Sequence, residues 1–303
     1  NKNSCESIFN ISKPDYCINA AAYTAVDKAE NEPEKAHLIN VIGTKNLAEV
    51  CKDFGTTLIH ISTDFVFDSN KSVPYTEHDP TNPQSVYGQT KLDGEKVIQE
   101  VLNEYFIIRT SWVYSRFGNN FMKTILRLAE ERTSLSIVSD QIGTPTNAVD
   151  LAEVLIKIIL FSSLSKGEGW DAAFGIYHFS NEGQCSWFDF AQKILESNNV
   201  NIDLQPIPTT SYPTPAQRPK YSVLDKSKIK TVFGIEIKTW EDNRDTAAKF
   251  SPIVFYYDHT GAPAWFSEKQ VSELIERAAS AWSQCGIPAQ VIIKNTKTSQ
   301  STN

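Results

Sequence analysis

A tyrosine, a lysine and a threonine are the residues of this chain whose types and spacing could do chemistry. Tyr87 and Lys91 lie four residues apart, a spacing that puts both side chains on one face of a helix. There the Lys91 ammonium is expected to lower the pKa of the Tyr87 phenol, so that it can exchange a proton near neutral pH. Thr63 lies earlier, in S-T-D-F-V-F at 62–67, after an apolar run. The combination predicts reduction of a carbonyl group.

Each of these residues also has a structural interpretation. A Tyr-x-x-x-Lys pair recurs on many solvated helix faces, and a threonine can simply end or cap a strand. The catalytic interpretation of Tyr87 and Lys91 is favoured because Thr63 precedes them after an apolar strand. Thr63 itself is favoured by this context and not by its chemistry alone.

The elements that must position these residues alternate between strand and helix. Short apolar runs predict strands at 16–20, 57–61, 105–110, 135–138 and 175–180. Apolar residues at helical spacing predict helices at 33–54, 86–103, 120–132, 147–161, 186–197 and 241–249, and another that begins at 267. The run at 57–61 is nearly continuous, which is typical of a parallel strand covered on both faces. The alternation predicts an α/β fold with a doubly wound, Rossmann-like parallel sheet.

Composition and charge exclude several classes of function. The net charge of −7, from 29 Lys and Arg against 36 Asp and Glu, argues against a nucleic-acid surface. No apolar stretch is long enough to span a membrane. The five cysteines are scattered, without a C-x-x-C pair or a histidine at metal spacing, which predicts reduced thiols in the cytoplasm and no metal site.

Several motifs give the chain a resemblance to a known family. In order, they are N-A-A-A-Y-T-A-V-D at 19–27, S-T-D-F-V-F at 62–67, Y-G-Q-T-K at 87–91, R-T-S-W-V-Y at 109–114, G-N-N-F at 118–121, D-Q-I-G-T-P-T at 140–146 and P-T-P-A-Q-R-P at 213–219. With these motifs the chain resembles the extended short-chain dehydrogenase/reductase family and, within it, the dTDP-4-dehydrorhamnose reductases. The resemblance covers about residues 8 to 245.

The resemblance implies an activity and roles for three residues. The reaction is hydride transfer from NADPH or NADH to C4 of a dTDP-4-dehydro-6-deoxy-L-hexose, giving dTDP-L-rhamnose. Tyr87 would donate a proton to the C4 oxygen, Thr63 would hydrogen-bond the developing oxyanion, and Lys91 would lower the tyrosine pKa and bond the nicotinamide ribose. The implied partner is the dTDP-sugar, and the family leaves a homodimer open.

The resemblance also implies two sets of binding residues. The cofactor would contact Ala20, Ala21, Ala22, Tyr23 and Lys91, because small residues after a strand let a dinucleotide approach the backbone. The substrate set is Thr63, Asp64, Tyr87, Trp112, Asn120 and Arg218. Trp112 would form a wall of the sugar pocket, with a place in the core as its alternative. Arg218 would hold the diphosphate bidentately, with an ordinary surface charge as its alternative. Asp27 and Asp64 are as well explained by orienting loops.

The chain departs from the family at both ends. The first strand and the Gly-rich phosphate turn of the family would precede Asn1. Because this turn holds the pyrophosphate, we expect weak dinucleotide binding and slow catalysis, and the preference for NAD or NADP cannot be read from this sequence. We also expect the strand at 16–20 to form an open edge of the sheet. The predicted units are an incomplete dinucleotide-binding domain at 1–180, a substrate-binding region at 181–250 and an unrelated βαβ-like extension at 251–303. The extension weakly resembles the opening of matrixin-type metalloproteases, without their zinc-binding helix.

Two other functions remain open on the sequence. The regulatory subunit of methionine adenosyltransferase shares the fold and part of the motifs around Thr63 and Tyr87, although the motifs at 109–114 and 213–219 fit a reductase better. A sugar-nucleotide 4,6-dehydratase or 4-epimerase is the third interpretation. Dehydratases carry acidic residues beside the threonine, and here Asp64 is followed by Phe65, so reduction is preferred.

Overall fold

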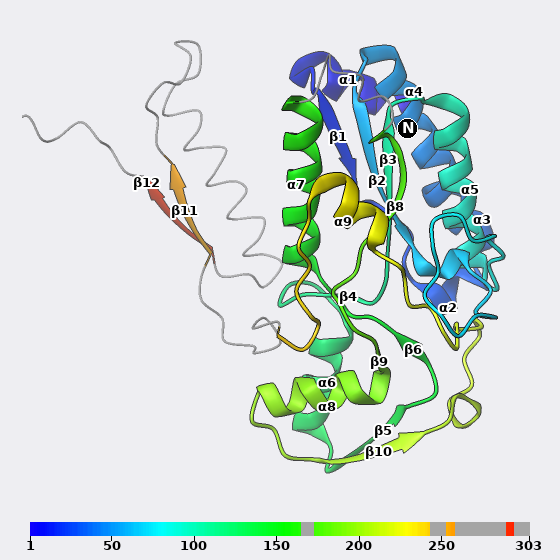
Figure 1. The fold of residues 1–303 in the computed structure, drawn as a ribbon, viewed down its shortest axis with the longest axis vertical. Helices are drawn as coiled ribbons and strands as arrows, with labels where there is room; N and C mark the ends of the chain where they lie inside the picture. Colours follow the sequence, from blue (N-terminus) through cyan, green and yellow to red (C-terminus); the bar gives the residue numbers. More distant parts are fainter. Residues whose placement is uncertain (165–172, 243–252, 258–288, 294–303) are drawn as a thin grey trace, which may run out of the picture.

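The centre of the molecule is a parallel sheet of four strands in the order β1-β2-β3-β8 (Figure 1). The strands are β1 (Tyr16–Asn19), β2 (Thr57–Thr63), β3 (Tyr105–Thr110) and β8 (Gly175–His178). This computed structural model describes residues 1–164, 173–242, 253–257 and 289–293. Its parallel sheet between helices confirms the predicted Rossmann-like α/β fold.

Helices cover both faces of this sheet. The strands alternate apolar residues between two cores, with Leu58 and Ile107 on one side and Ile59 and Phe106 on the other. The helices α1 (Lys2–Ser12), α4 (Thr44–Phe54) and α5 (Val86–Val101) pack on the first side. The helices α7 (Ala148–Leu164) and α9 (Ser227–Phe233) pack on the second. Burial on both faces explains the nearly continuous apolar sequence of β2.

The helical segment predicted at 33–54 contains a change of helix type. It consists of α3 (Pro33–His37), a π-helical stretch (Leu38–Gly43) and α4, which ends at Gly55 in the left-handed conformation. The π-helical stretch contains the buried Asn40, whose side chain bonds the backbone N–H of Tyr23 at 2.8 Å and the Thr90 hydroxyl at 3.0 Å. π-Helical turns are rare and occur mostly within α-helices, frequently at functional sites. Here the π-helical stretch ties the loop after β1 to α5.

A second group of elements, with a core of its own, lies below the sheet in Figure 1. It is built by α6 (Phe121–Glu131), α8 (Trp187–Ser197) and the parallel pair β5 (Ser134–Val138) and β10 (Asp203–Ile207). Two short strand pairs complete the region: β4 (Val113–Tyr114) with β7 (Thr146–Asn147), and β6 (Ile142–Gly143) with β9 (Cys185–Ser186). This core therefore draws on both sides of residue 180. Pro206 takes part in a two-stranded sheet, which has only edge strands.

The remaining elements are short. They are α2 (Val26–Ala29), a 3₁₀ turn (Asp64–Val66), a second 3₁₀ turn (Thr209–Ser211), and the parallel pair β11 (Ile253–Tyr257) and β12 (Ala289–Ile293). The predicted helix beginning at 267 lies outside the described residues, as does most of the one predicted at 241–249. The sequence analysis missed α1 and α9. Within the described ranges, no helix has the length and apolar character needed to cross a membrane.

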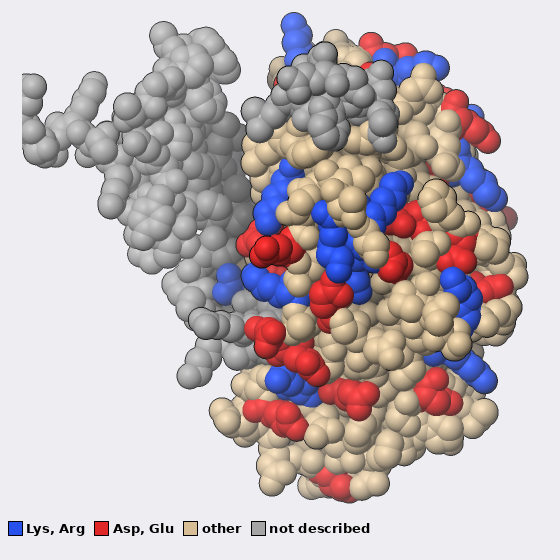
Figure 2. Space-filling model, viewed as in Figure 1, with Lys and Arg blue, Asp and Glu red and all other residues tan. Residues whose placement is uncertain are grey.

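The distribution of charge agrees with the sequence analysis. Figure 2 shows Lys and Arg interspersed with Asp and Glu over the visible face, without a continuous basic stripe. Nucleic-acid surfaces concentrate basic side chains on one face or along one helix. The visible face does not have that pattern.

Candidate active site

Thr63 is the last residue of β2, at the edge of the sheet where parallel strands end. Its backbone is extended, and its hydroxyl oxygen accepts a hydrogen bond from the Phe65 N–H at 3.2 Å. The side chain thus caps the 3₁₀ turn that follows, as threonine commonly does at a helix start. Thr63 and Thr110 are partners in the β2–β3 register. The threonine is buried, so its position is fixed by both the strand and the turn.

The first turn of α5 brings Tyr87 to this threonine. Ser85 caps the start of the helix, and its hydroxyl accepts from the Gly88 N–H at 3.1 Å. A Cβ on Gly88 would overlap the carbonyl oxygen of Phe65, so only glycine lets the helix approach the turn this closely. The Tyr87 ring meets Phe65 edge-on at 5.5 Å. The Thr63 side chain is close enough to the Tyr87 hydroxyl to influence its pKa.

We expect Gly88→Ala to destabilise the fold by about 1–3 kcal/mol, because the added methyl forces α5 away from the turn. Urea-induced unfolding measures the loss. Gly43→Ala is the matched control, since that helical glycine has only an ordinary contact at 3.6 Å to the Leu38 carbonyl and alanine favours helix. Equal unfolding midpoints for the two variants would show that the approach at Gly88 is not tight.

The pKa of Tyr87 differs from the sequence expectation. Burial raises it to about 12; the Thr63 side chain opposes the rise, and the Asp64 carboxylate adds to it. The predicted lowering by Lys91 is therefore wrong for this structure. Its physical reason is that the Lys91 side chain turns into the sheet instead of towards the phenol. Tyr87 is held as a protonated phenol, which is the form that a proton donor needs.

Lys91 is buried between α5 and β2. Its Nζ donates to the carbonyl oxygen of Ile61 at 2.6 Å and lies 3.1 Å from Nε2 of His60. Burial lowers the pKa of Lys91 to about 8, and the charge of Glu95 acts in the opposite direction. In the family Lys91 would bond the nicotinamide ribose. That role stays a prediction.

The loop after β1 carries the small residues predicted to meet the cofactor. Ala20 and Ala21 are exposed, and Ala22 is half-buried. Tyr23 is different: its ring is buried in a small cluster against Tyr87, and its hydroxyl donates to Glu32 at 2.7 Å. The Tyr23 side chain therefore supports the loop, and its assignment to cofactor binding stays a prediction.

Two predicted substrate residues have clear positions. Asp64 is buried beside Thr63, whose hydroxyl donates to it at 3.1 Å, and burial raises its pKa to about 6. Trp112 has a positive φ of 46° and stacks on Trp187 with ring centroids 3.6 Å apart, directly over Gly143. It is half-buried. It therefore packs against the core below the sheet and is also partly exposed.

Asn120 is the N-cap residue of α6. Its Oδ1 accepts from the Lys123 N–H at 3.2 Å, while its Nδ2 donates to the carbonyls of Ser115 and Phe117 at 2.5 and 3.1 Å. Asparagine is a preferred N-cap, and here the cap also closes the loop before α6. Its assignment to the substrate stays a prediction.

Arg218 forms a bidentate ion pair within the protein. Its two terminal nitrogens donate to the Asp27 carboxylate at 2.9 and 2.7 Å, and the Ala216 N–H donates to the same carboxylate at 3.3 Å. The planar guanidinium matches a carboxylate in the way it would match a diphosphate. The ion pair joins the proline-rich loop to α2, and the role of Arg218 in diphosphate binding stays a prediction.

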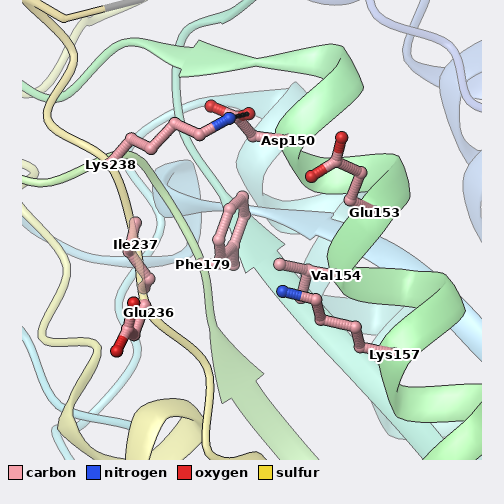
Figure 3. A pocket seen from close by; sticks show the side chains of 8 residues that line it. All are labelled: Asp150, Glu153, Val154, Lys157, Phe179, Glu236, Ile237 and Lys238. Carbon is pink, nitrogen blue, oxygen red and sulfur yellow. Dashed lines mark hydrogen bonds and ion pairs between the residues drawn. The ribbon is translucent and has the colours of Figure 1, made fainter.

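Two cavities lie on different parts of the molecule. One of about 550 Å³ is lined by the proline-rich loop, including Arg218 and Lys220. The other, of about 330 Å³, lies between α7 and the segment at 236–238 (Figure 3), where Lys238 reaches Asp150 at 3.3 Å. None of Thr63, Tyr87 and Lys91 is among the residues that line either cavity.

Sequence reasoning missed a set of buried polar residues behind the site. They are Asn19, His60, Ser62, Glu95 and Arg109. His60 and Ser62 interrupt an otherwise apolar strand, and Glu95 follows Lys91 by one helical turn. A polar residue inside a strand that is buried on both faces needs a partner. That signal was available and could have identified them.

The donor set fits the nicotinamide half of a dinucleotide. The exposed Ala20 and Ala21 leave the carboxyl end of β1 open to close approach, and Lys91 and the Thr63–Tyr87 pair lie on the neighbouring elements. A ligand outside the carboxyl ends of parallel strands is the usual arrangement in open α/β sheets.

Comparisons with known proteins agree with this geometry. A family model described as the RmlD substrate binding domain matches residues 1–250. A dTDP-4-dehydrorhamnose reductase of Aggregatibacter actinomycetemcomitans is 44% identical over 250 residues, which cover 80% of this chain and 83% of the relative. The chain belongs to the dTDP-4-dehydrorhamnose reductase family. The reductase of Escherichia coli K12 is also 44% identical, over 235 residues that cover 76% of this chain and 77% of that one.

Solved structures of dTDP-4-dehydrorhamnose reductases share the fold. The Clostridium acetobutylicum protein is 41% identical with a TM-score of 0.74, covering 80% of this chain and 82% of that one. The Bacillus anthracis protein, solved in complex with NADP, is 39% identical with a TM-score of 0.74, covering 80% and 83%. A UDP-glucose 4-epimerase from Brucella ovis is 17% identical with a TM-score of 0.66, covering 82% and 81%, and shows the fold alone.

Residues 251–303 lie beyond the range that the reductase family model matches. The weak resemblance of this segment to matrixin-type metalloproteases finds no support in these comparisons. The expected weak binding of dinucleotide stays a prediction.

Proposed function

We propose that this chain has the reductase activity of its family: reduction of dTDP-4-dehydrorhamnose to dTDP-L-rhamnose with NADPH or NADH. The observation that carries the proposal is the Thr63–Tyr87 hydroxyl pair beside Lys91, at the carboxyl edge of the sheet. Relatives at 44% identity named as this reductase support it, as does the NADP complex of the Bacillus anthracis protein.

The residues of the site have separate roles in carbonyl reduction. The cofactor, when bound, supplies the hydride. Tyr87 holds its proton across the neutral range because its pKa is raised to about 12, and it donates that proton to the C4 oxygen. Thr63 is fixed by the strand and the 3₁₀ turn, so its hydroxyl needs only to rotate from Asp64 to donate a hydrogen bond to the same oxygen. Lys91 and the loop at 20–22 orient the nicotinamide side.

The neighbouring structures do not favour the other two functions. The epimerase is below the identity at which more than the fold can be carried over, and the relatives at 44% identity are named as reductases, not as synthetase subunits. The four described cysteines that are free, Cys5, Cys17, Cys51 and Cys185, suit a reducing compartment such as the cytoplasm. A homodimer stays a prediction.

The test is to follow NADPH and NADH oxidation with dTDP-4-dehydrorhamnose and to identify the product by chromatography and mass spectrometry. We expect stoichiometric formation of dTDP-L-rhamnose. A product at the oxidation level of the substrate would contradict reduction and would favour the epimerase interpretation. Binding of substrate and cofactor without any turnover would contradict a reductase and favour a binding subunit.

A further inference from the structure

A buried line of hydrogen-bonding groups runs behind the active site, from Asn19 through His60 to Lys91. Asn19 on β1 and His60 on β2 are register partners. Asn19 Nδ2 lies 3.0 Å from His60 Nδ1, and His60 Nε2 lies 3.1 Å from Lys91 Nζ. The three residues are 7%, 1% and 2% exposed. Groups buried this deeply must satisfy one another.

The orientation of the Asn19 amide is fixed by the backbone. The Ala21 N–H, which can only donate, bonds Asn19 Oδ1 at 3.2 Å. The opposite orientation would place the amide nitrogen against the Ala21 N–H, two donors facing each other. The Asn19 NH₂ therefore faces His60 and donates to Nδ1, which must carry a lone pair.

This contact decides the tautomer of His60. A neutral imidazole has one N–H and one lone pair, so with Nδ1 accepting, the proton is on Nε2. A doubly protonated ring would set a second N–H against the Asn19 NH₂. Burial holds the pKa of His60 well below its usual value, and the charge of Lys91 lowers it further. His60 is thus neutral, with its Nε2–H directed at Lys91.

Lys91 must then accept this hydrogen bond through a lone pair, which only a neutral amine has. Its remaining hydrogens include the one donated to the Ile61 carbonyl at 2.6 Å. The ionisable groups on the elements around it are Glu95 and Tyr87 on α5, Asp64 after β2, and Arg109 on β3. Glu95, whose charge favours the ammonium form, is itself bound by Arg109.

We propose that Asn19 and His60 are positioning residues that hold Lys91 as a neutral amine against β2. This rests on the proposed function only in naming Lys91 as a residue of the reductase site. A proton that Lys91 takes from solvent would face the Nε2–H of His60 and repel it. Protonation therefore favours an extended Lys91, able to reach the cofactor side of α5. Burial lowers the pKa of Lys91 to about 8, so the neutral amine becomes the main form above that pH.

The test measures the tautomer of His60 and the titration of Lys91 by NMR, with ¹⁵N-histidine and ¹³Cε-lysine labels and without turnover. Lys91→Gln and His60→Phe identify the signals. In the unsubstituted chain we expect the Nε2–H tautomer of His60 and a lysine that titrates near pH 8. An Nδ1–H tautomer, or a Lys91 that titrates at the usual lysine pKa, would overturn the proposal.

Asn19→Asp is the matched variant. Aspartate has the same shape as asparagine but should reverse the direction of the hydrogen bond to His60. One carboxylate oxygen keeps the Ala21 N–H, and the other presents an acceptor to His60 Nδ1. We expect His60 to switch to the Nδ1–H tautomer and the Lys91 titration to rise by about one pH unit or more, because Nε2 then accepts from the ammonium.

The negative charge that Asn19→Asp introduces raises the Lys91 titration by itself, so the double variant Asn19→Asp/His60→Phe is the control. A smaller rise without His60 supports the proposal. An equal rise with and without His60 overturns it. If Asn19→Asp does not fold, the tautomer in the unsubstituted chain still decides. Because no step requires catalysis, failure here is distinct from failure of the proposed reductase activity.

Discussion

Replacing Tyr87 by phenylalanine is expected to lower kcat for reduction of dTDP-4-dehydrorhamnose by about 10²–10⁴-fold, the usual contribution of a positioned proton donor. The substitution removes one hydroxyl and leaves the ring contact with Phe65 in place. Binding of the nucleotide sugar, measured by calorimetry, should change little. The loss should therefore be seen in kcat and not in substrate affinity.

The control for this variant is Tyr105→Phe, which removes a hydroxyl from a half-buried tyrosine on β3 that has no place in the proposed chemistry. Its kcat should match that of the unsubstituted chain. Retention of more than about a tenth of the activity by Tyr87→Phe would be too much for a proton donor. In that case another group would have to protonate the C4 oxygen.

The pH dependence separates Tyr87 from Lys91. Because the pKa of Tyr87 is raised to about 12, the phenol keeps its proton through the neutral and mildly alkaline range and cannot cause a change of rate there. The pKa of Lys91 is lowered to about 8, so the ammonium form is lost as the pH rises through that value. A change of kcat near pH 8 is therefore expected to come from the lysine.

Much of the fold could be predicted because its strands are buried on both faces. The strand at 105–110 was predicted with the bounds that the structure has, and the start of the helix at residue 86 agrees. The π-helical stretch around Asn40 could not be predicted, because it depends on contacts with Tyr23 and Thr90. The local pattern of apolar residues shows that an element is buried, but it does not show which distant residues the element contacts.

The same difference between local patterns and distant contacts applies to the site. Thr63 and Tyr87 meet as expected, since a strand end and the next helix start lie at one edge of the sheet. The partner of Arg218 is Asp27, 191 residues away in sequence. No local feature of the sequence predicts this pair. Asn120 is different: an asparagine directly before an amphipathic helix is a cap signal, and the sequence analysis did not use it.

Arg109→Met is expected to destabilise the fold by about 3–5 kcal/mol, because it leaves the Glu95 carboxylate buried without its partner. The ion pair is bidentate, with Nη2–Oε2 at 2.7 Å and Nε–Oε1 at 3.0 Å, and the side chains are 3% and 1% exposed. The Ser62 hydroxyl donates to the same carboxylate. One remaining hydroxyl cannot replace a guanidinium, so unfolding in urea should begin at much lower concentration.

The cost belongs to the unpaired charge and not to the loss of attraction alone. The double variant Arg109→Met/Glu95→Leu should therefore recover a large part of the stability, since no buried charge is left. Arg127→Met is the exposed control: its pair with Glu131 is 58% and 52% exposed, and such pairs contribute about 0.3–0.5 kcal/mol. If the double variant were as unstable as Arg109→Met, the pair would stabilise the fold through packing, and the charge argument would fail. Recovery without reductase activity would instead show that the buried pair is retained for the arrangement of α5 and its Tyr87, at some cost in stability.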